Sequence, residues 1–402
     1  MRLKLVNIKE IATYDPDSDS VSRVEKQELL ITDGKITAIG SNLGQANTEI
    51  DCQNCLVTPG FVDPHTHPVF WQGREIEFAR RIAGATYQEI AAEGGGIRSS
   101  IAGVRKADYQ ELRQAVKNRL NRFLNLGTTT IEAKSGYGLS TESELKSLEI
   151  LADLNEDHSI DIMPTFMGAH AFPAEYADDP DQYVDLLCEE MIPAVARQGI
   201  ARYCDVFCEN GYFSVAQSRR ILEAGSQAGL IPRLHADEFE DSGAAELAAE
   251  MKAVSADHLM AVSGEGMNAM AKAGVIATLL PGTTFFLGQH NYAPARELID
   301  RGITIALATD FNPGSCHIQS MPFIISLACL QLKMTIEEAF TAATYNSARA
   351  IGMEAKIGSL TVGKQADVII WGIKNLMEIP YNVTDIPIRN VIKSGQPVFR
   401  LD

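Results

Sequence analysis

The sequence predicts an α/β protein: a (β/α)8 barrel of the TIM type with a small β-sandwich domain formed by the N- and C-terminal segments. Three observations predict it. Apolar runs of strand length alternate with helix-length segments through the middle of the chain, both ends carry hairpin-like patterns, and polar side chains follow the apolar runs. Eight parallel strands with intervening helices close most naturally into a barrel, whose reactive groups lie at the C-terminal ends of the strands.

Each barrel strand is expected at one short apolar run. The eight runs lie at 58–64, 128–133, 161–167, 203–208, 231–235, 253–257, 275–280 and 304–309. Between them, the segment 108–126 is predicted to be a helix, started by the capping pair Asp108 and Glu111 and stopped by Gly127. Thr141 and Glu144 repeat this start signal before "LKSLEILADL".

The two ends of the chain read as β-structure. "LLITDGKITAIG" alternates around an Asp-Gly turn, and "KQADVIIWG" and "RNVIKSGQPVF" show similar short runs with a Ser-Gly turn. We expect these flanks to pair with each other. The predicted domains are therefore residues 1–57 with 356–402, and residues 58–355.

Composition narrows the class of function. The chain has 402 residues, 46% of them hydrophobic and 22% charged, which is ordinary globular usage. A formal net charge of −17 disfavours nucleic acid and anionic membranes as partners and favours a small molecule. Seven scattered cysteines and the lack of a leader-like or membrane-spanning apolar segment predict a cytoplasmic protein.

Polar residues with metal and acid–base chemistry follow the predicted strands. His65 and His67 are spaced by two, so on an extended segment both imidazoles project to one side and can reach one ion. By itself this pair is equally compatible with strand-end polar residues. With His235 and Asp310 at two other strand ends, the set has the three or four ligands that a mononuclear hydrolytic site requires.

Two further residues have two readings each. Glu238, three residues after His235, is either an acid/base group beside the metal or part of a solvated acidic loop. His258 either stabilises an oxyanion or is a core histidine. The remaining strand-end polar residues are His170, Glu209 and Asn210, and Asp63 reads as a structural residue near the ligands.

Eight segments together resemble the imidazolonepropionase family of the amidohydrolase superfamily. They are "HTHPVFWQGR", "GGGIRSS", "EAKSGYGL", "FMGAHAFP", "DVFCENGYF", "LHADEF", "SADHL" and "ATDFNPGS", and the resemblance covers essentially the whole chain. It implies a metal-dependent hydrolase of histidine degradation, which opens the lactam C–N bond of 4-imidazolone-5-propanoate to give N-formimidoyl-L-glutamate.

The resemblance also implies roles for individual residues. One zinc or iron ion, Zn(2+) or Fe(2+/3+), would be held by His65, His67, His235 and Asp310. Glu238 would be the acid/base group. Our own mechanistic hypothesis adds His258, which would stabilise the oxyanion with the metal, and Asp310, a ligand that would share the role of base. The residues implied to bind substrate are Arg74, Tyr87, Tyr137, His170, Glu238, Asn312, Gly314 and Ser315. A cationic residue suits the carboxylate tail of this substrate, and tyrosine and histidine side chains suit the edge of its planar ring.

The pattern departs from binuclear amidohydrolases at the fourth strand. That strand closes as "VFCENG" without the bridging carboxylated lysine of binuclear members, so a mononuclear site is expected. Lys134 is then an unassigned polar residue near the mouth. The run 94–97, "GGGI", lacks a phosphate-loop ending and reads as a flexible piece of the long connection after the first strand; whether the loop at 94–100 moves on binding is left open by the sequence.

Two other functions fit much of the same pattern. A mononuclear deaminase of a purine or pyrimidine would share the metal and acid/base residues but would not need Arg74. A non-catalytic scaffold with the same barrel would not need the ligands at all. The family analogy adds a homodimer as the candidate assembly.

Overall fold

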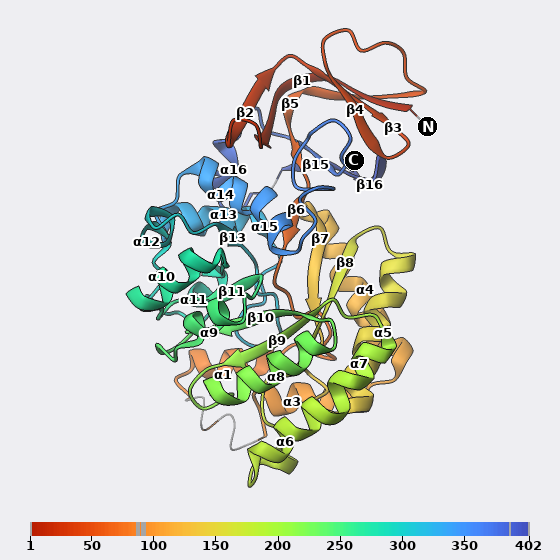
Figure 1. Ribbon diagram of the computed structural model, residues 1–402. Coiled ribbons are helices and arrows are strands. Elements are labelled where there is room, and N and C mark those ends of the chain that lie inside the picture. Colours follow the sequence, from red (N-terminus) through yellow and green to blue (C-terminus); the bar gives the residue numbers. More distant parts are fainter. Residues whose placement is uncertain (1, 86–88, 90–93, 386, 401–402) are drawn as a thin grey trace.

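The computed structural model describes residues 2–85, 89, 94–385 and 387–400. Within these residues the chain forms two eight-stranded sheets, one closed into a barrel ringed by helices and one packed at an end of that barrel (Figure 1). The predicted fold class is confirmed. The division at 57/58 and 355/356 stays a prediction.

The barrel strands are all parallel, and their order along the sheet follows their order in the chain. They are β6 (Phe61–Asp63), β7 (Thr128–Lys134), β8 (Asp161–Ala169), β9 (Tyr203–Cys208), β10 (Ile231–Ala236), β11 (Ser255–His258), β12 (Ile276–Leu279) and β13 (Ile305–Leu307). Each lies on one of the predicted runs.

The barrel closes where β6 and β13 end. The backbone N–H of His67 donates to the carbonyl of Phe311 at 2.9 Å, and that of Asp310 donates to His65 at 3.2 Å. The seam therefore places two predicted ligand segments side by side.

Helices follow the barrel strands and cover the outside of the barrel. They are α1 (Glu75–Ile82), α3 (Ile97–Lys106), α4 (Tyr109–Asn125), α5 (Thr141–Asp157), α6 (Pro180–Leu186), α7 (Ile192–Gln198), α8 (Val215–Gln227), α9 (Ala244–Glu250), α10 (Gly264–Ala273), α11 (Pro281–Phe286), α12 (Ala295–Asp300), α13 (Met321–Leu330), α14 (Ile336–Ala342), α15 (Tyr345–Ala350) and α16 (Glu378–Tyr381). A short 3-10 turn, η1 (Ala174–Tyr176), and a π-helical turn, η2 (Leu187–Met191), flank α6.

The start of α4 is as predicted, whereas the start of α5 is not. The Asp108 carboxylate accepts the backbone N–H groups of Gln110 and Glu111, at 2.8 and 3.4 Å. At α5 the cap is Ser140, one residue before the predicted Thr141. Glu144 is instead buried and turned back towards the preceding loop, because that loop offers it three backbone N–H groups.

The second sheet is built from both ends of the chain, as expected. Its strands are β1 (Arg2–Asp15), β2 (Ser20–Glu25), β3 (Glu28–Thr32), β4 (Lys35–Gly40), β5 (Thr48–Pro59), β14 (Val368–Trp371), β15 (Ile388–Lys393) and β16 (Gln396–Arg400). The two halves join where β5 pairs antiparallel with β14. Both predicted turns have left-handed backbones, with φ of 48° and 79° at Asp33 and Gly34 and 48° and 75° at Ser394 and Gly395.

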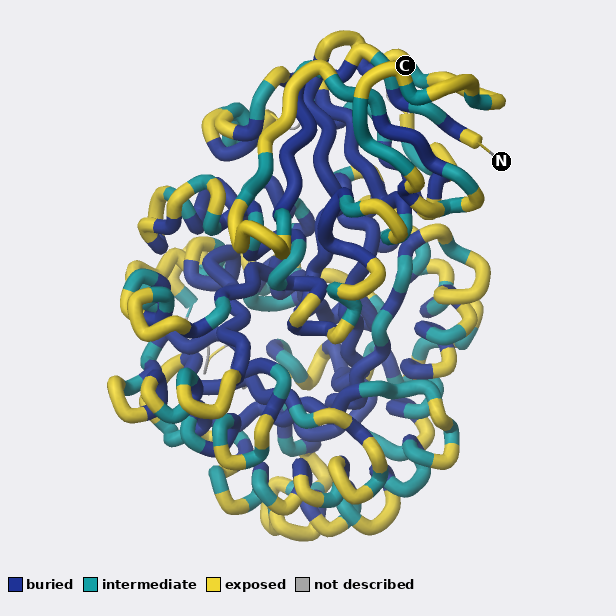
Figure 2. Tube along the Cα trace, turned by 45° about the horizontal axis from the view of Figure 1, so that its top comes forward, coloured by how far each residue is buried: buried dark blue, intermediate teal, exposed yellow. Residues whose placement is uncertain are grey.

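This second sheet curls until its two turns meet. Ala366 donates its backbone N–H to Gly34, and Gly395 donates to Ala366. The curled sheet encloses its own apolar core, which includes Leu5, Ile31 and Val368. The burial pattern shows these buried strands beside the buried wall of the barrel, with exposed residues on the outer helices (Figure 2). Among the described helices, none combines the length and apolarity needed to cross a bilayer.

Candidate active site

Four predicted ligands converge at the C-terminal ends of the barrel strands. The Nε2 atom of His67 lies 3.2 Å from Nε2 of His65 and 3.4 Å from Nε2 of His235. The Asp310 Oδ1 atom lies 3.6 and 3.5 Å from Nε2 of His65 and His67. In a tetrahedral site with ligand distances of about 2.1 Å, the ligand atoms are about 3.4 Å apart. The spacing therefore fits one metal ion.

The tautomers of two histidines support the same conclusion. The Nδ1 of His65 lies 2.7 Å from Asp257 Oδ2, and the Nδ1 of His235 lies 2.9 Å from Asp205 Oδ1. Carboxylates only accept, so each Nδ1 carries the proton and each Nε2 presents a lone pair to the cluster. Burial first, and then the neighbouring cations and histidines, hold the pKa of His65 and His67 well below the usual value. Converging lone pairs on neutral imidazoles are a favourable arrangement only around a cation.

Buried charges behind the histidines fix these carboxylates. Lys134 contacts Asp205 at 2.7 Å and Glu132 at 2.8 Å, and Arg233 contacts Asp257 at 3.1 Å. Burial alone would raise the pKa of Asp205, but Lys134, His235 and Arg233 hold it well below its usual range. Lys134 is fully buried and is absent from the cavity wall, so its expected place near the mouth was wrong. The cause is its pairing inside the barrel.

Asp310 is oriented from two sides. Its Oδ2 accepts from the Thr283 hydroxyl at 2.5 Å, and its backbone has a left-handed φ of 53°, which is strained for aspartate. Asp63, the last residue of the neighbouring strand β6, accepts from the backbone N–H and the hydroxyl of Thr309 at 3.1 and 2.6 Å. Asp63 is thus structural, as expected: it fixes the turn that carries Asp310.

Glu238 and His258 face each other beside the ligands. Glu238 is 8% exposed and lines the cavity, which excludes the solvated-loop reading. Burial, with Asp310 and Glu209 nearby, raises its pKa well above the usual value. Its Oε2 lies 3.7 Å from Nε2 of His258, too far for a hydrogen bond but close enough for both to reach one small ligand.

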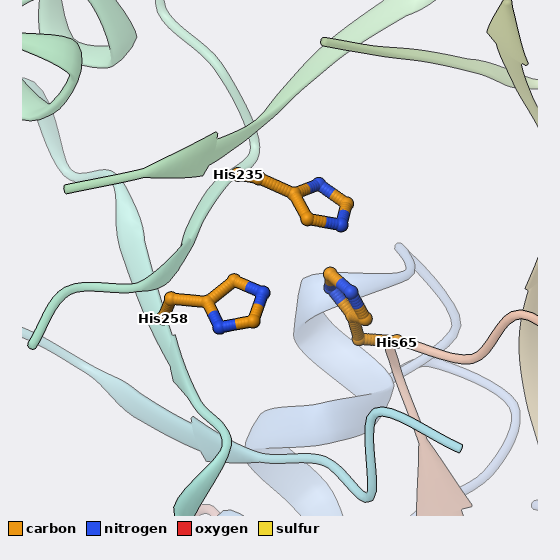
Figure 3. A group of neighbouring side chains, drawn as sticks. All are labelled: His65, His235 and His258. Carbon is orange, nitrogen blue, oxygen red and sulfur yellow. The ribbon is translucent and has the colours of Figure 1, made fainter. Parts of the chain in front are cut away.

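The His258 ring has no hydrogen-bond partner on either nitrogen among the described residues, although it is buried. Figure 3 shows it pointing into the space that His65 and His235 also face. Its φ of 81° is strained for a histidine. A strained, buried and unsatisfied imidazole argues against the reading of an ordinary core histidine.

A cavity of about 470 Å³ opens over this cluster. Its wall combines the catalytic candidates with aromatic, cationic and amide side chains. The lining residues are His67, Arg74, Arg81, Ile97, Tyr137, His170, Phe207, Tyr212, His235, Glu238, Phe239, His258, Leu287, Gln289, Asp310, Asn312, Gly314 and Ser315. Every predicted substrate residue lies on this wall except Tyr87, which is outside the described residues.

Arg74 and Gly314 are in direct contact. Arg74 precedes α1, and its Nε lies 3.3 Å from Glu77 Oε2. A Cβ on Gly314 would lie only 1.5 Å from Nη2 of Arg74. Glycine is therefore required at 314 for Arg74 to occupy this position. Asn312 makes the turn possible, because its Oδ1 accepts the backbone N–H groups of Gly314 and Ser315 at 2.8 and 2.7 Å.

Tyr137 and His170 contribute an aromatic part of the cavity wall, and their ring centroids are 5.0 Å apart. His170 Nδ1 lies 2.9 Å from the Gly136 carbonyl, so this nitrogen donates and Nε2 is left as an acceptor. Burial, with His235 nearby, lowers the pKa of His170 to about 3. The imidazole is thus neutral and suited to accept a ring N–H.

Several contributing residues were not among the sequence candidates. Asp205, Asp257 and Arg233 lie inside strands. Their signal was available as charged residues in apolar runs, in "YCDVFC", "IPRLH" and "SADH". Glu209 was singled out without a role; its buried carboxylate accepts the Phe239 backbone N–H at 2.9 Å and so anchors the segment that carries Glu238.

The expected loop at 94–100 is only partly a loop. Residues 97–100 form the first turn of α3, and Gly96 precedes it with φ of 71°. Glu77 of α1 accepts from the Gly96 backbone at 3.0 Å and from the Ser99 hydroxyl at 3.2 Å. The start of α3 is thereby tied to the helix that follows Arg74.

Comparison with known proteins places the chain in a family. The model of the amidohydrolase family matches residues 56–398. The imidazolonepropionase of Alkaliphilus metalliredigens is 51% identical over 389 residues, covering 95% of this chain and 92% of its own. The imidazolonepropionase of Brevibacillus brevis is 50% identical over 386 residues, covering 94% and 91%.

Solved structures share the fold at low identity. The 5-methylcytosine deaminase of Klebsiella pneumoniae superposes with a TM-score of 0.78 at 17% identity, covering 99% of this chain and 98% of that one. The zinc-bound adenosine deaminase of Xanthomonas campestris has a TM-score of 0.72 at 17% identity, covering 98% and 92%. Since these two similarities concern the fold, the assignment rests on the family model and the close relatives: this chain belongs to the amidohydrolase family and, within it, to the metal-dependent imidazolonepropionases.

Proposed function

We propose that this protein hydrolyses the lactam C–N bond of 4-imidazolone-5-propanoate and releases N-formimidoyl-L-glutamate, a step of histidine degradation. The observation that carries the proposal is the composition of one cavity wall. The hydrolytic residues Glu238 and His258 share it with Arg74, a cation that a substrate with a carboxylate tail requires.

In the proposed metal site, His65, His67, His235 and Asp310 would hold one zinc or iron ion. When bound, the ion supplies Lewis acidity that makes water a better nucleophile at neutral pH. His65 and His235 would present their Nε2 lone pairs to the ion, because Asp257 and Asp205 accept from their Nδ1 atoms.

The proton transfers belong to Glu238. Water attacks the ring carbonyl, and Glu238 accepts the proton that the water loses. As the lactam C–N bond breaks, Glu238 returns that proton to the departing ring nitrogen. Its buried position and raised pKa suit a group that must both take up and release a proton. Asp310, which is also buried, is the second candidate base.

Charge that develops on the carbonyl oxygen is stabilised by His258. Its nitrogens are without partners among the described residues, so a neutral imidazole can donate there without breaking an existing bond. On the substrate ring, His170 Nε2 accepts an N–H. Arg74, with the turn of Asn312, Gly314 and Ser315, holds the carboxylate tail.

The test is an ultraviolet assay of imidazolonepropanoate loss, with the product identified by mass. A panel of purines, pyrimidines and hydantoins is run beside it on the metal-loaded protein. We expect turnover of imidazolonepropanoate alone. Turnover of a cytosine- or guanine-type base with release of ammonia, and none of imidazolonepropanoate, would overturn the proposal in favour of a deaminase. Failure to bind a metal would favour a non-catalytic scaffold.

A further inference from the structure

A second arginine shares the cavity wall with Arg74. Arg81 lies on α1, seven residues after Arg74, and both side chains line the cavity. Within the described part of the chain, Arg74 and Arg81 are the two Lys or Arg side chains that line the cavity.

Two aromatic rings flank the Arg81 guanidinium. It lies 5.5 Å from the Phe78 ring centroid and 5.7 Å from that of Phe286, and these two rings are 5.1 Å apart. Its Nη2 is buried and accepted by no group among the described residues. A buried guanidinium N–H without an acceptor is costly, unless a ligand supplies the missing oxygen.

The charges of Arg74, Arg81 and the neighbouring Glu77 do not cancel. Glu77 forms an ion pair with Arg74, and its carboxylate also accepts from Gly96 and Ser99. The group of Arg74, Arg81 and Glu77 sums to a net charge of +1, which a single carboxylate bound to the arginines would balance. Burial, and next the proximity of Arg74, lowers the pKa of Arg81, as expected for a cation that lacks its counterion.

We infer that Arg81 is a specificity-determining residue that, together with Arg74, binds the carboxylate tail of the substrate. The inference rests on the proposed function and extends it. The aromatic pair pre-orients the Arg81 fork, so little side-chain entropy is lost when the carboxylate binds.

The test is a thermodynamic cycle that combines one change in the protein, the loss of the Arg81 charge, with one change in the substrate, the loss of the carboxylate charge. Wild-type protein and Arg81→Met are assayed with imidazolonepropanoate and with its neutral propanamide analogue. We expect Arg81→Met to raise KM for the carboxylate substrate by about ten- to a hundredfold, with a smaller change in kcat. The preference for carboxylate over amide should fall by a similar factor.

Three controls separate this role from a structural one. Arg80→Met removes the same charge from the adjacent helix position, which is outside the cavity wall, and should leave the preference unchanged. Arg81→Lys keeps the cation and should restore most of the preference. Metal content and melting temperature show that each variant is folded and loaded.

The outcomes distinguish the two hypotheses. If wild-type protein does not turn over imidazolonepropanoate, the proposed function fails. Suppose that the wild-type protein turns over imidazolonepropanoate, and that Arg81→Met loses activity equally on both substrates or on neither. Arg81 then does not recognise the carboxylate, and this inference is wrong although the proposed function stands.

Discussion

At the scale of single residues, the site depends on atoms that are held before any ligand arrives. His65 and His235 each have one nitrogen committed to a buried aspartate and the other aimed at the ligand cluster. Gly314 leaves room for the Arg74 guanidinium in its present position, which a Cβ at 314 would overlap. Such preorganisation limits the reorganisation that catalysis would otherwise require.

Replacing Glu238 and replacing His235 should have different consequences. We expect Glu238→Gln to retain metal and to lose about 10²- to 10⁴-fold in kcat, because glutamine cannot carry the proton. His235→Ala should lose metal as well as activity, since it removes a ligand and leaves Asp205 unpaired. Metal analysis beside steady-state kinetics distinguishes the two. Full activity in Glu238→Gln would contradict its role.

The aspartate behind His65 should govern metal affinity. In Asp257→Asn the side-chain amide can donate to Nδ1, which moves the ring proton to Nε2 and blocks the ligand atom. We expect the Kd for Zn²⁺ to rise about ten- to a hundredfold. Chelator competition measures this change, and exposed Asp241→Asn serves as the matched control. An unchanged Kd in Asp257→Asn would show that the aspartate does not set the tautomer.

At the scale of elements, loops are held by buried side chains from the following helix. Between β7 and α5, Glu144 accepts the backbone N–H groups of Gly136, Gly138 and Leu139 at 2.9, 2.9 and 2.8 Å. Tyr137 lies in the middle of this loop and on the cavity wall. One buried carboxylate thus links the start of a helix to the shape of the cavity.

Glu144→Gln should weaken this loop. Glutamine replaces one acceptor oxygen by an NH₂ group that faces a backbone N–H, so the free energy of unfolding should fall by about 1–3 kcal/mol. KM should rise because Tyr137 shifts. Chemical denaturation and kinetics test both effects, with Glu142→Gln, an exposed position on the same helix, as control. Equal stability of the two variants would refute the proposed anchoring.

At the scale of the whole molecule, a buried lysine joins the two sheets through an ion pair. Lys393 of β15 contacts Asp367 before β14 and Asp161 at the start of β8, each at 2.6 Å. This lysine is 3% exposed and connects the end-built sheet to the barrel. Burial raises the pKa of Asp367, and Lys393 acts against that rise.

Lys393→Met should destabilise the fold in a pH-dependent way. Removing one partner of a buried pair costs about 3–5 kcal/mol, because Asp367 is left as a buried charge. The pKa of Asp367 should rise further in the variant. A carboxyl group whose pKa is higher in the folded than in the unfolded protein contributes to the free energy of unfolding at low pH, and this contribution is lost as the pH rises through the folded-state pKa.

The measurement is urea unfolding at about pH 5 and about pH 8. The deficit of Lys393→Met relative to wild type should be smaller at the lower pH, whereas exposed Lys374→Met should show no such trend. A deficit that is equal at both values, or larger at the acidic one, would show that the unpaired Asp367 charge is not its cause.

Local pattern was sufficient for much of this fold because each strand is a short apolar run bounded by clear breakers. It was insufficient where a residue had two competing partners. Thr141 and Glu144 match a helix start, yet Glu144 turns to the loop that tertiary packing brings to it. Lys134 looked like a polar residue near the mouth for the same reason: its partner Asp205 is 71 residues away in the chain.

The sequence by itself determined the order of barrel elements, the pairing of the two ends and the identity of the four converging residues that we propose as metal ligands, because periodicity and residue type are local properties. Only the tertiary structure decided which nitrogen of each histidine faces the cluster, why position 314 is glycine, and that Arg81 lies on the cavity wall. Each of these depends on distances between segments far apart in the chain, and the closure of the barrel sets those distances.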